Sequence, residues 1–223
     1  PYTTLFRSVE VLTPICKAYP SDEAWGLIGE SIQAHGGYGF CEDYPVAQAA
    51  RDVKIYSIWE GTNFLQSQDL IGRKWTMKKG QVFQDFLKDI VDFVAANKGK
   101  VSELDKEFAN LEKALASYQE IMMTMGGYMA AKKFGYFQTY ARRILTASGQ
   151  LYGGYCLLEQ ALIAKQRMEE LGSDHFDYNY YYGKFLSAKY YLRNVVPHIW
   201  YIAEVVKDGD TSVIEAPVEI FEY

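Results

Sequence analysis

Apolar residues recur at helical spacing through the first third of the chain. One helix is predicted from Ser21, a good N-cap residue, to Gly36-Gly37, a common C-terminal stop. Pro45 can open a second, short helix at its first position, where a missing N–H costs little. A third helix is expected from Gly61-Thr62 to about Trp75. The segment IWEGTN, residues 58–63, therefore falls on a turn between two helices.

The pattern restarts near Lys79-Gly80 and predicts long helices to the end of the chain. One apolar stripe covers residues 82–94, and a second, with spacings of four and three, covers 104–125. Further helices are expected over residues 129–171, where Gly153-Gly154 allows a break, and over 182–206, with a kink at Pro197. No alternating strand pair is recognisable. We therefore predict an all-α chain, with one helical-bundle segment at residues 9–79 and a second antiparallel helical bundle at 80–223.

Composition narrows the classes of function. The 223 residues carry a net charge of -5, which disfavours nucleic acid or an anionic membrane surface as a partner. No stretch of about 20 apolar residues indicates a transmembrane segment. The three cysteines form no CxxC pair, which favours a reducing, cytoplasmic location, and the three histidines show no metal-ligand spacing.

The first eight residues, PYTTLFRS, are expected not to belong to the native protein. They can be written back as CCC TAC ACG ACG CTC TTC CGA TCT, which resembles a common sequencing adapter translated in frame. The alternative is an ordinary helix start. If the adapter interpretation holds, the native chain extends further toward its N-terminus.

Four motifs follow one another between Ile32 and Gln66. They are Gln33-Ala34-His35-Gly36-Gly37-Tyr38-Gly39, Asp43-Tyr44-Pro45, Arg51-Asp52-Val53-Lys54-Ile55 and Trp59-Glu60-Gly61-Thr62. In order and spacing this segment resembles the C-terminal helical domain of the acyl-CoA dehydrogenase family, a likeness that covers roughly residues 9–79. Residues 80–223 resemble the additional C-terminal helical domain of a longer bacterial subgroup of that family.

The resemblance implies a role for Glu60. In the family, the Glu of the EGT motif removes a proton from the carbon α to the thioester carbonyl, while a hydride leaves the β carbon for flavin N5. Burial beside an acyl chain raises the pKa of such a carboxylate into a useful range. The alternative is that Glu60 is an exposed acid that only stabilises the start of the next helix.

The same resemblance implies contacts for the neighbours of Glu60. Gly61 and Trp59 would contact substrate, although Trp59 could equally be core packing. FAD would be bound by Gln33, Gly36 and Gly37, in the family usually the FAD of an adjacent subunit, and by Thr62, Asn63 and Phe64. Gly36-Gly37 is also an ordinary helix stop, and both roles can hold. Phe64 departs from the small or polar residue usual in the family, so its contacts are the least secure.

The expected function is that of a C-terminal fragment of an FAD-dependent acyl-CoA dehydrogenase. Its partners would be an acyl-CoA, an electron-transferring flavoprotein and further copies in a homodimer or homotetramer. An acyl-CoA oxidase or a desulfinase of the same fold remains an alternative. A third alternative is a helical module that serves dimerisation only. The family's N-terminal helical domain and middle β domain are not in this sequence, so the fragment alone should be inactive.

Overall fold

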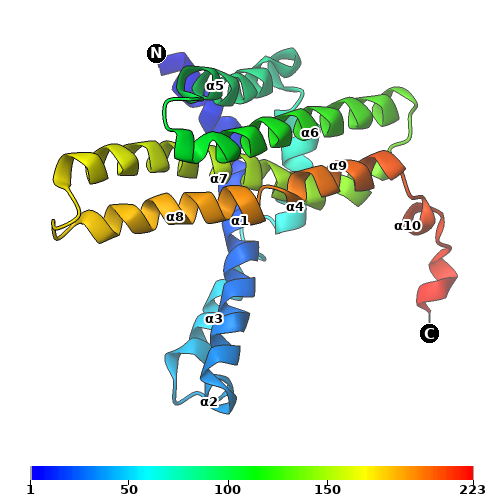
Figure 1. Cartoon of the computed structure of the whole chain (residues 1–223). Helices are drawn as coiled ribbons and strands as arrows, with labels where there is room; N and C mark the ends of the chain where they lie inside the picture. The colour runs from blue at the N-terminus through cyan, green and yellow to red at the C-terminus, as the bar shows by residue number, and fades with distance from the viewer. Residues whose placement is uncertain (1, 223) are drawn as a thin grey trace. The chain divides into compact units, whose positions relative to one another are not determined.

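The computed structural model describes residues 2–222, with side chains for residues 9–222. The chain divides into two compact units: residues 1–85 with 141–146, and residues 86–140 with 147–223. The described residues contain helices and no strand (Figure 1), so the prediction of an all-α chain is confirmed. Each helix in residues 2–222 is too short or too polar to span a lipid bilayer.

The first unit is built on α1, Tyr2–His35, which packs against most of the other helices of this unit, while the last short turn packs against the one before it. These are α2 (Gly37–Phe40), α3 (Pro45–Tyr56), α4 (Asn63–Asp69), the π turn η1 (Leu70–Lys74) and the 3-10 turn η2 (Met77–Gly80). Helix α3 returns along α1 in the opposite direction (Figure 1). The predicted start at Pro45 is confirmed, and α4 begins one residue after Thr62.

The predicted N-cap at Ser21 is wrong, because α1 continues through both Pro14 and Pro20. Ser21 is buried, and its hydroxyl donates to the carbonyl oxygens of Lys17, at 3.1 Å, and Ala18, at 2.9 Å. A proline removes one helical hydrogen bond and crowds the preceding turn. The Ser21 hydroxyl thus bonds carbonyl oxygens of its own helix, instead of accepting from the N–H groups of a following first turn as an N-cap residue would.

Two glycines shape the turn from α1 into α3. Gly36 adopts φ 62° and ψ -148°, a region that side chains rarely tolerate. A Cβ on Gly39 would lie 2.5 Å from the carbonyl oxygen of Ile32, so only glycine lets α2 lie this close to α1. The predicted stop at Gly36-Gly37 is therefore confirmed, with a short extra helix, α2, that the sequence pattern did not predict.

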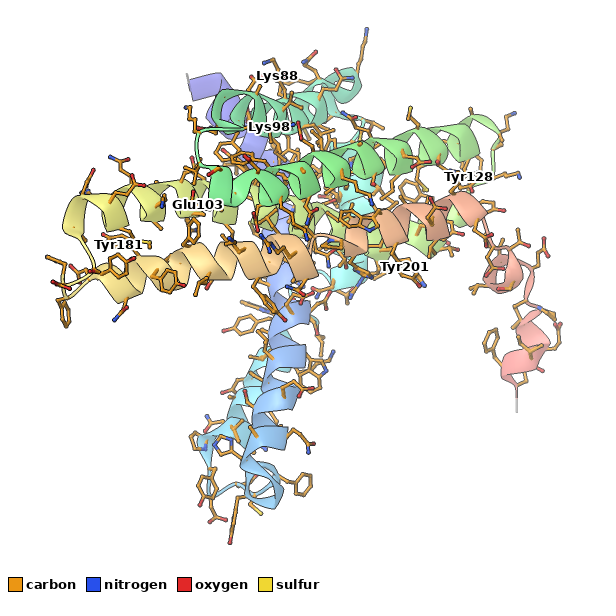
Figure 2. All side chains as sticks on the ribbon, viewed as in Figure 1. Lys88, Lys98, Glu103, Tyr128, Tyr181 and Tyr201 are labelled. Carbon is orange, nitrogen blue, oxygen red and sulfur yellow. The ribbon has the colours of Figure 1, made fainter. Side chains whose placement is uncertain are left out.

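The second unit consists of long helices that reverse direction from one to the next, except that the last continues in the direction of the helix before it (Figure 1). They are α5 (Gln81–Asn97, from residue 86), α6 (Asp105–Ala130, after the short turn η3, Ser102–Leu104), α7 (Gly135–Leu171, except 141–146), α8 (Tyr178–Asn194) and α9 (His198–Asp208). Tyr118 on α6 and Ser148 on α7 share a buried hydrogen bond of 2.6 Å. Tyr128, near the end of α6, donates to the carbonyl of Val206 on α9 (Figure 2).

Helix α7 runs unbroken through Gly153-Gly154, so the break that these glycines allow does not occur. A Cβ on Gly153 would lie 2.7 Å from the Tyr191 hydroxyl, and one on Gly154 would lie 2.9 Å from Cγ2 of Val196. The glycines therefore admit neighbouring side chains to the surface of α7. Met129 belongs to α6, and α7 begins at Gly135.

The last predicted helix is two helices. Pro197 lies in the break between α8 and α9 and acts as the N-cap of α9, so the expected kink is a full interruption. Beyond α9 the tail forms a four-residue helix, α10 (Ser212–Glu215), and a turn, η4 (Val218–Phe221).

Two predictions about chain organisation stay predictions. One of them is the predicted domain boundary between Lys79 and Gly80. The adapter origin of PYTTLFRS is the other. Residue 1 and the side chains of residues 2–8 lie outside the described part, and the backbone of 2–8 belongs to α1.

Candidate active site

The turn between α3 and α4 has an unusual backbone. Glu60 has φ 53° and Gly61 has φ 84°, so two successive residues occupy the left-handed region. For a residue with a side chain this costs on the order of 1 kcal/mol. A Cβ on Gly61 would also lie 3.1 Å from Nε2 of Gln66, and that amide donates to the Glu60 carbonyl at 3.2 Å. The backbone itself therefore requires glycine at position 61, independently of any substrate.

Helix α4 starts from this turn with a capped end. The Thr62 hydroxyl accepts a hydrogen bond from the N–H of Leu65 at 3.3 Å, as expected for an N-cap residue. The N–H of Asn63 donates to the carbonyl of Ser57 across the turn at 3.2 Å. Within the described part of the chain, no acceptor is bonded to the backbone N–H of Glu60. That donor is therefore available to a ligand.

Helix α1 holds the turn through Lys17 and Asn63. The Lys17 ammonium donates to the Gly61 carbonyl at 2.7 Å and to Oδ1 of Asn63 at 2.9 Å. The Asn63 side chain is buried, and its Nδ2 lies within hydrogen-bonding distance of the Ala18 carbonyl, the Ser21 hydroxyl and Asp22 Oδ1. Asn63 therefore joins the start of α4 to α1.

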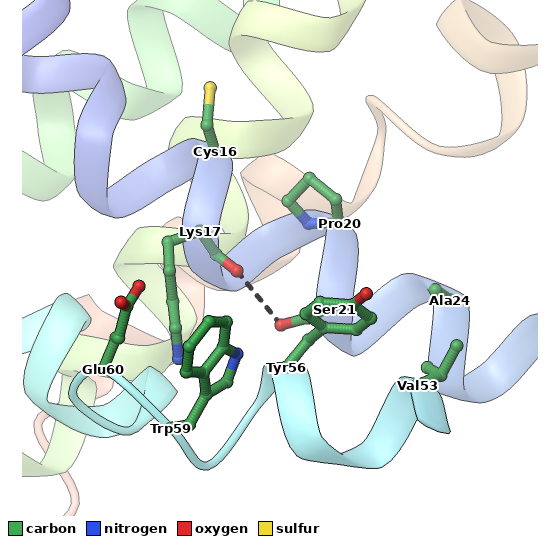
Figure 3. Close-up of a pocket in the computed structure, with 9 residues that line it drawn as sticks. All are labelled: Cys16, Lys17, Pro20, Ser21, Ala24, Val53, Tyr56, Trp59 and Glu60. Carbon is green, nitrogen blue, oxygen red and sulfur yellow. Dashed lines mark hydrogen bonds between the residues drawn. The ribbon is translucent and has the colours of Figure 1, made fainter. Parts of the chain in front are cut away.

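A pocket of about 400 Å³ opens beside Glu60 in the first unit (Figure 3). Its lining comes from α1, α3 and the turn: Cys16, Lys17, Pro20, Ser21, Ala24, Val53, Tyr56, Trp59 and Glu60. Figure 3 shows the Lys17 side chain descending from α1 to the turn, between Glu60 and Trp59. The pocket thus presents one carboxylate on walls that are largely apolar or aromatic.

Large apolar side chains around the pocket are only partly covered. Trp59 is 49% exposed, Tyr56 53% and Phe64 41%, although each is large enough to occupy a core position. Singly exposed apolar residues are common, whereas a group of them beside a pocket indicates a surface that binds something. Trp59 is thus not ordinary core packing within this chain.

Lys17 and Cys16, two other ionisable groups in the pocket, do not compete with Glu60 as a base. Burial lowers the pKa of Lys17, an effect opposed by the negative charges of Asp22 and Glu60. Its two hydrogen bonds to acceptors are those of an ammonium group. Desolvation raises the pKa of the Cys16 thiol, which disfavours the nucleophilic thiolate.

The predicted site residues fall into two groups within one chain. Trp59, Glu60, Gly61, Thr62, Asn63 and Phe64 lie together at the turn, whereas Gln33, Gly36 and Gly37 lie exposed at the far end of α1. Sixteen helical residues separate Lys17 from Gln33, a rise of about 24 Å. The two groups therefore lie well apart on one copy, and the role of the second group toward the FAD of an adjacent subunit stays a prediction.

Sequence reasoning did not identify Lys17 and Asp22 as parts of the site. Asp22 forms an ion pair with Arg142 at 2.5 Å and accepts from Asn63, while Lys17 bonds the turn. Spacings of four and five residues on α1 place Lys17, Ser21 and Asp22 near one another. The sequence signal that could have identified them was a lysine and a serine among the buried positions of a helix.

A second pocket, of about 430 Å³, lies between α5 and α6 of the second unit. It is lined by Val91, Val94, Ala95, Lys98, Glu112, Leu115, Ala116 and Gln119. Its only charged lining residues, Lys98 and Glu112, form an ion pair with each other at 2.7 Å. This pocket therefore offers no free acid or base. Nor do residues 9–222 contain three His, Cys, Asp or Glu side chains grouped to hold a metal ion.

Sequence comparison defines the class of protein to which this fold and site belong. The family described as "Acyl-CoA dehydrogenase, C-terminal domain" matches residues 7–74, and that described as "Acetyl-CoA dehydrogenase C-terminal like" matches residues 86–217. Together they cover both units. The chain belongs to the acyl-CoA dehydrogenase family.

Individual relatives agree with this assignment. A butyryl-CoA dehydrogenase of Syntrophomonas wolfei is 48% identical over 209 residues, which is 94% of this chain and 34% of the relative. A second butyryl-CoA dehydrogenase of that organism is 44% identical over 93% of this chain and 34% of its own length. A broad-specificity linear acyl-CoA dehydrogenase of Mycobacterium tuberculosis is 31% identical over 92% of this chain and 34% of its own length. The chain thus spans about a third of the length of these relatives.

Proposed function

We propose that this chain is the C-terminal part of an FAD-dependent acyl-CoA dehydrogenase in which Glu60 is the catalytic base. The reaction breaks one C–H bond α and one β to the thioester carbonyl and forms a trans double bond between those carbons. The proton from the α carbon passes to the Glu60 carboxylate. Because two similar relatives are named butyryl-CoA dehydrogenases, butyryl-CoA is the first substrate to test.

The observation that carries this proposal is the pairing of two groups on one residue. The Glu60 side chain reaches the pocket, and its backbone N–H has no acceptor in the described residues. A thioester whose carbonyl oxygen accepts from that N–H would have its α carbon close to the carboxylate. Donation to the oxygen stabilises the negative charge that develops as the proton leaves. The left-handed turn makes both groups available together.

The apolar pocket walls supply the second requirement, a raised basicity of Glu60. An exposed carboxylate is too weak a base to remove such a proton in water. An acyl chain packed against Trp59 and Tyr56 would exclude water from the pocket and thereby favour the protonated form of Glu60. We propose Trp59 and Gly61 as substrate contacts on this ground.

The residues available for FAD fit the group in part. Gln33, Gly36, Gly37 and Phe64 are exposed and able to contact a flavin nucleotide, and the Thr62 hydroxyl keeps its own proton for donation. FAD, when bound, supplies the acceptor for the hydride that leaves the β carbon. The Asn63 side chain, by contrast, is buried and fully engaged with α1, so we propose that it serves FAD only by fixing the turn.

Other partners follow from the same proposal. Because the two groups of FAD-binding residues lie far apart on one chain, a complete cofactor site needs a second copy, as in a homodimer or homotetramer. Electrons would pass on to an electron-transferring flavoprotein.

The test is substitution of Glu60 in the complete protein. Glu60→Gln keeps the side-chain shape but cannot accept the proton. We expect bound FAD to remain while its anaerobic bleaching by butyryl-CoA slows by about 100-fold or more. Glu159→Gln, an exposed carboxylate on α7 outside the pocket, is the matched control and should bleach at the wild-type rate. Rapid bleaching in Glu60→Gln would refute the assignment. Hydrogen peroxide formed in air by the wild type would instead identify an oxidase.

A further inference from the structure

We propose that Lys17 is a positioning residue that keeps the Glu60–Gly61 turn in its left-handed conformation. Only the catalytic consequence of this inference rests on the proposed function. The structural part concerns the turn itself. Lys17 is on α1, 43 positions before Glu60, and no local sequence pattern connects the two.

The contacts of Lys17 lie on the residues that follow Glu60. Its ammonium bonds the Gly61 carbonyl at 2.7 Å and Asn63 Oδ1 at 2.9 Å, so one cation joins positions 61 and 63. The Gly61 carbonyl belongs to the peptide group that follows its left-handed φ. Fixing that oxygen limits rotation of the peptide group, and fixing Asn63 anchors the start of α4. Glu60 is held between this anchor and α3.

The unfavourable backbone of Glu60 explains why such a support is needed. A residue with a side chain stays at φ 53° only where surrounding contacts make the other conformations worse. In this turn the Gln66 amide holds the Glu60 carbonyl and Lys17 holds the next one. Without Lys17, Gly61 is free to take other conformations, since glycine accepts nearly all of them.

The support is itself fixed by other residues of the first unit. Asn63 Nδ2 lies 2.8 Å from Asp22 Oδ1 and 2.8 Å from the Ser21 hydroxyl, and Asp22 pairs with Arg142. The Lys17 ammonium is half-buried and therefore loses part of its hydration. Its hydrogen bonds to two protein acceptors in the turn offset this cost. Lys17 does not touch the reacting atoms in this arrangement. It determines where the Glu60 carboxylate and N–H are placed.

Backbone amide exchange of the full chain, followed residue by residue by NMR, tests the structural part. Lys17→Met keeps the length of the apolar stem and removes the donors. We expect exchange at the N–H groups of Asn63 and Leu65 to accelerate about tenfold or more, with α6 unaffected. Lys74→Met is the control, because Lys74 is also buried and pairs with Glu10 and Asp69. It should leave Asn63 and Leu65 at wild-type rates.

Unchanged exchange at Asn63 and Leu65 in Lys17→Met would overturn the proposal. If that variant does not fold, Lys17→Arg decides. It keeps the charge but replaces the ammonium by a planar guanidinium. The proposal then requires altered exchange confined to residues 58–66, and a wild-type profile there would contradict it.

The complete enzyme tests the catalytic consequence. Lys17→Met should lower kcat about tenfold to 100-fold with little change in KM, because the acyl pocket remains while the base is misplaced. Lys17→Arg should recover part of kcat. If wild-type enzyme does not dehydrogenate any acyl-CoA, the proposed function fails, whereas the exchange measurement still decides the role of Lys17. A wild-type kcat in Lys17→Met would refute the positioning role.

Discussion

At the scale of single residues, the candidate site depends on side chains that support the turn as much as on the acid it presents. Glu60 is exposed and Gly61 carries no side chain, so neither fixes its own geometry. Asn63 fixes the geometry of both residues, because its side chain is buried and both its amide oxygen and its amide nitrogen are hydrogen-bonded. The motif Trp59-Glu60-Gly61-Thr62 indicated the residue that we propose as the base. It could not indicate Lys17, whose relation to the turn exists only after α1 packs against α4.

The energetic role of Asn63 can be measured by its removal. Asn63→Ala deletes the partner of Lys17 and of Asp22 and leaves both charges with one hydrogen bond fewer. We expect the free energy of unfolding to fall by about 1.5–3 kcal/mol, the range for hydrogen bonds to charged groups. Denaturant unfolding of the full chain gives this value.

Asn194→Ala is the matched control for Asn63→Ala. Asn194 is exposed at the end of α8, where its amide donates to the carbonyl of Tyr190 in its own helix. Its removal should change the free energy of unfolding by about 0.5 kcal/mol or less. Equal effects of the two substitutions would show that Asn63 is not a special support of the turn.

At the scale of helices, sequence periodicity predicted most elements, and the errors occurred where tertiary packing outweighed a local rule. Ser21 reads as an N-cap residue, yet it lies buried inside α1, where its hydroxyl is 2.8 Å from the side-chain nitrogen of Asn63 on α4. Gly153-Gly154 reads as a possible helix break, yet α7 continues, and the two glycines leave space for the side chains of Tyr191 and Val196. Neither neighbour is adjacent in sequence, so no local pattern could reveal it.

The packing role of Gly154 is open to a direct test. A methyl group at this position would lie 2.9 Å from Cγ2 of Val196 and 3.5 Å from Leu111 and Leu192, all in the core. Gly154→Ala should therefore destabilise the chain by about 1–3 kcal/mol through overpacking, despite the better helix propensity of alanine. Thermal unfolding followed by circular dichroism measures the change.

Gly126→Ala, on another long helix, is expected to change the stability of the chain in the opposite direction. Gly126 is exposed on α6, and a Cβ there would meet nothing within 4 Å. Alanine should stabilise the chain by about 0.5–1 kcal/mol because only the helix propensity changes. If Gly154→Ala were stabilising as well, the glycine would not be present for close packing.

At the scale of the whole molecule, the chain carries the proposed base and, on our proposal, only part of the FAD site. The exposed Gln33, Gly36 and Gly37 lie at one end of α1, distant from Glu60 in the same copy. The first unit also exposes many large apolar side chains. Among them are Trp25, Leu27, Tyr38, Phe40, Tyr56 and Leu65. Such a surface favours association with other protein surfaces.

The isolated chain should accordingly fold without becoming a working enzyme. We expect it to form a dimer or larger species, to bind FAD weakly and to show no turnover. Light scattering gives the mass, and comparison with a shorter chain ending at Lys79 shows which unit contributes. A monomer that retained one FAD per chain through gel filtration would contradict both the partial site and the assembly.

Exchange of the α-proton tests the central claim, that Glu60 is the base, most directly. A butyryl-CoA analogue with sulfur in place of the β carbon has no hydrogen to lose as hydride at that position, so proton removal is observed alone. The complete holoenzyme in D₂O should introduce deuterium at the α carbon, detected by mass spectrometry. Glu60→Gln should slow this exchange by about 100-fold or more while still binding the analogue. Exchange at the wild-type rate in Glu60→Gln would contradict the account.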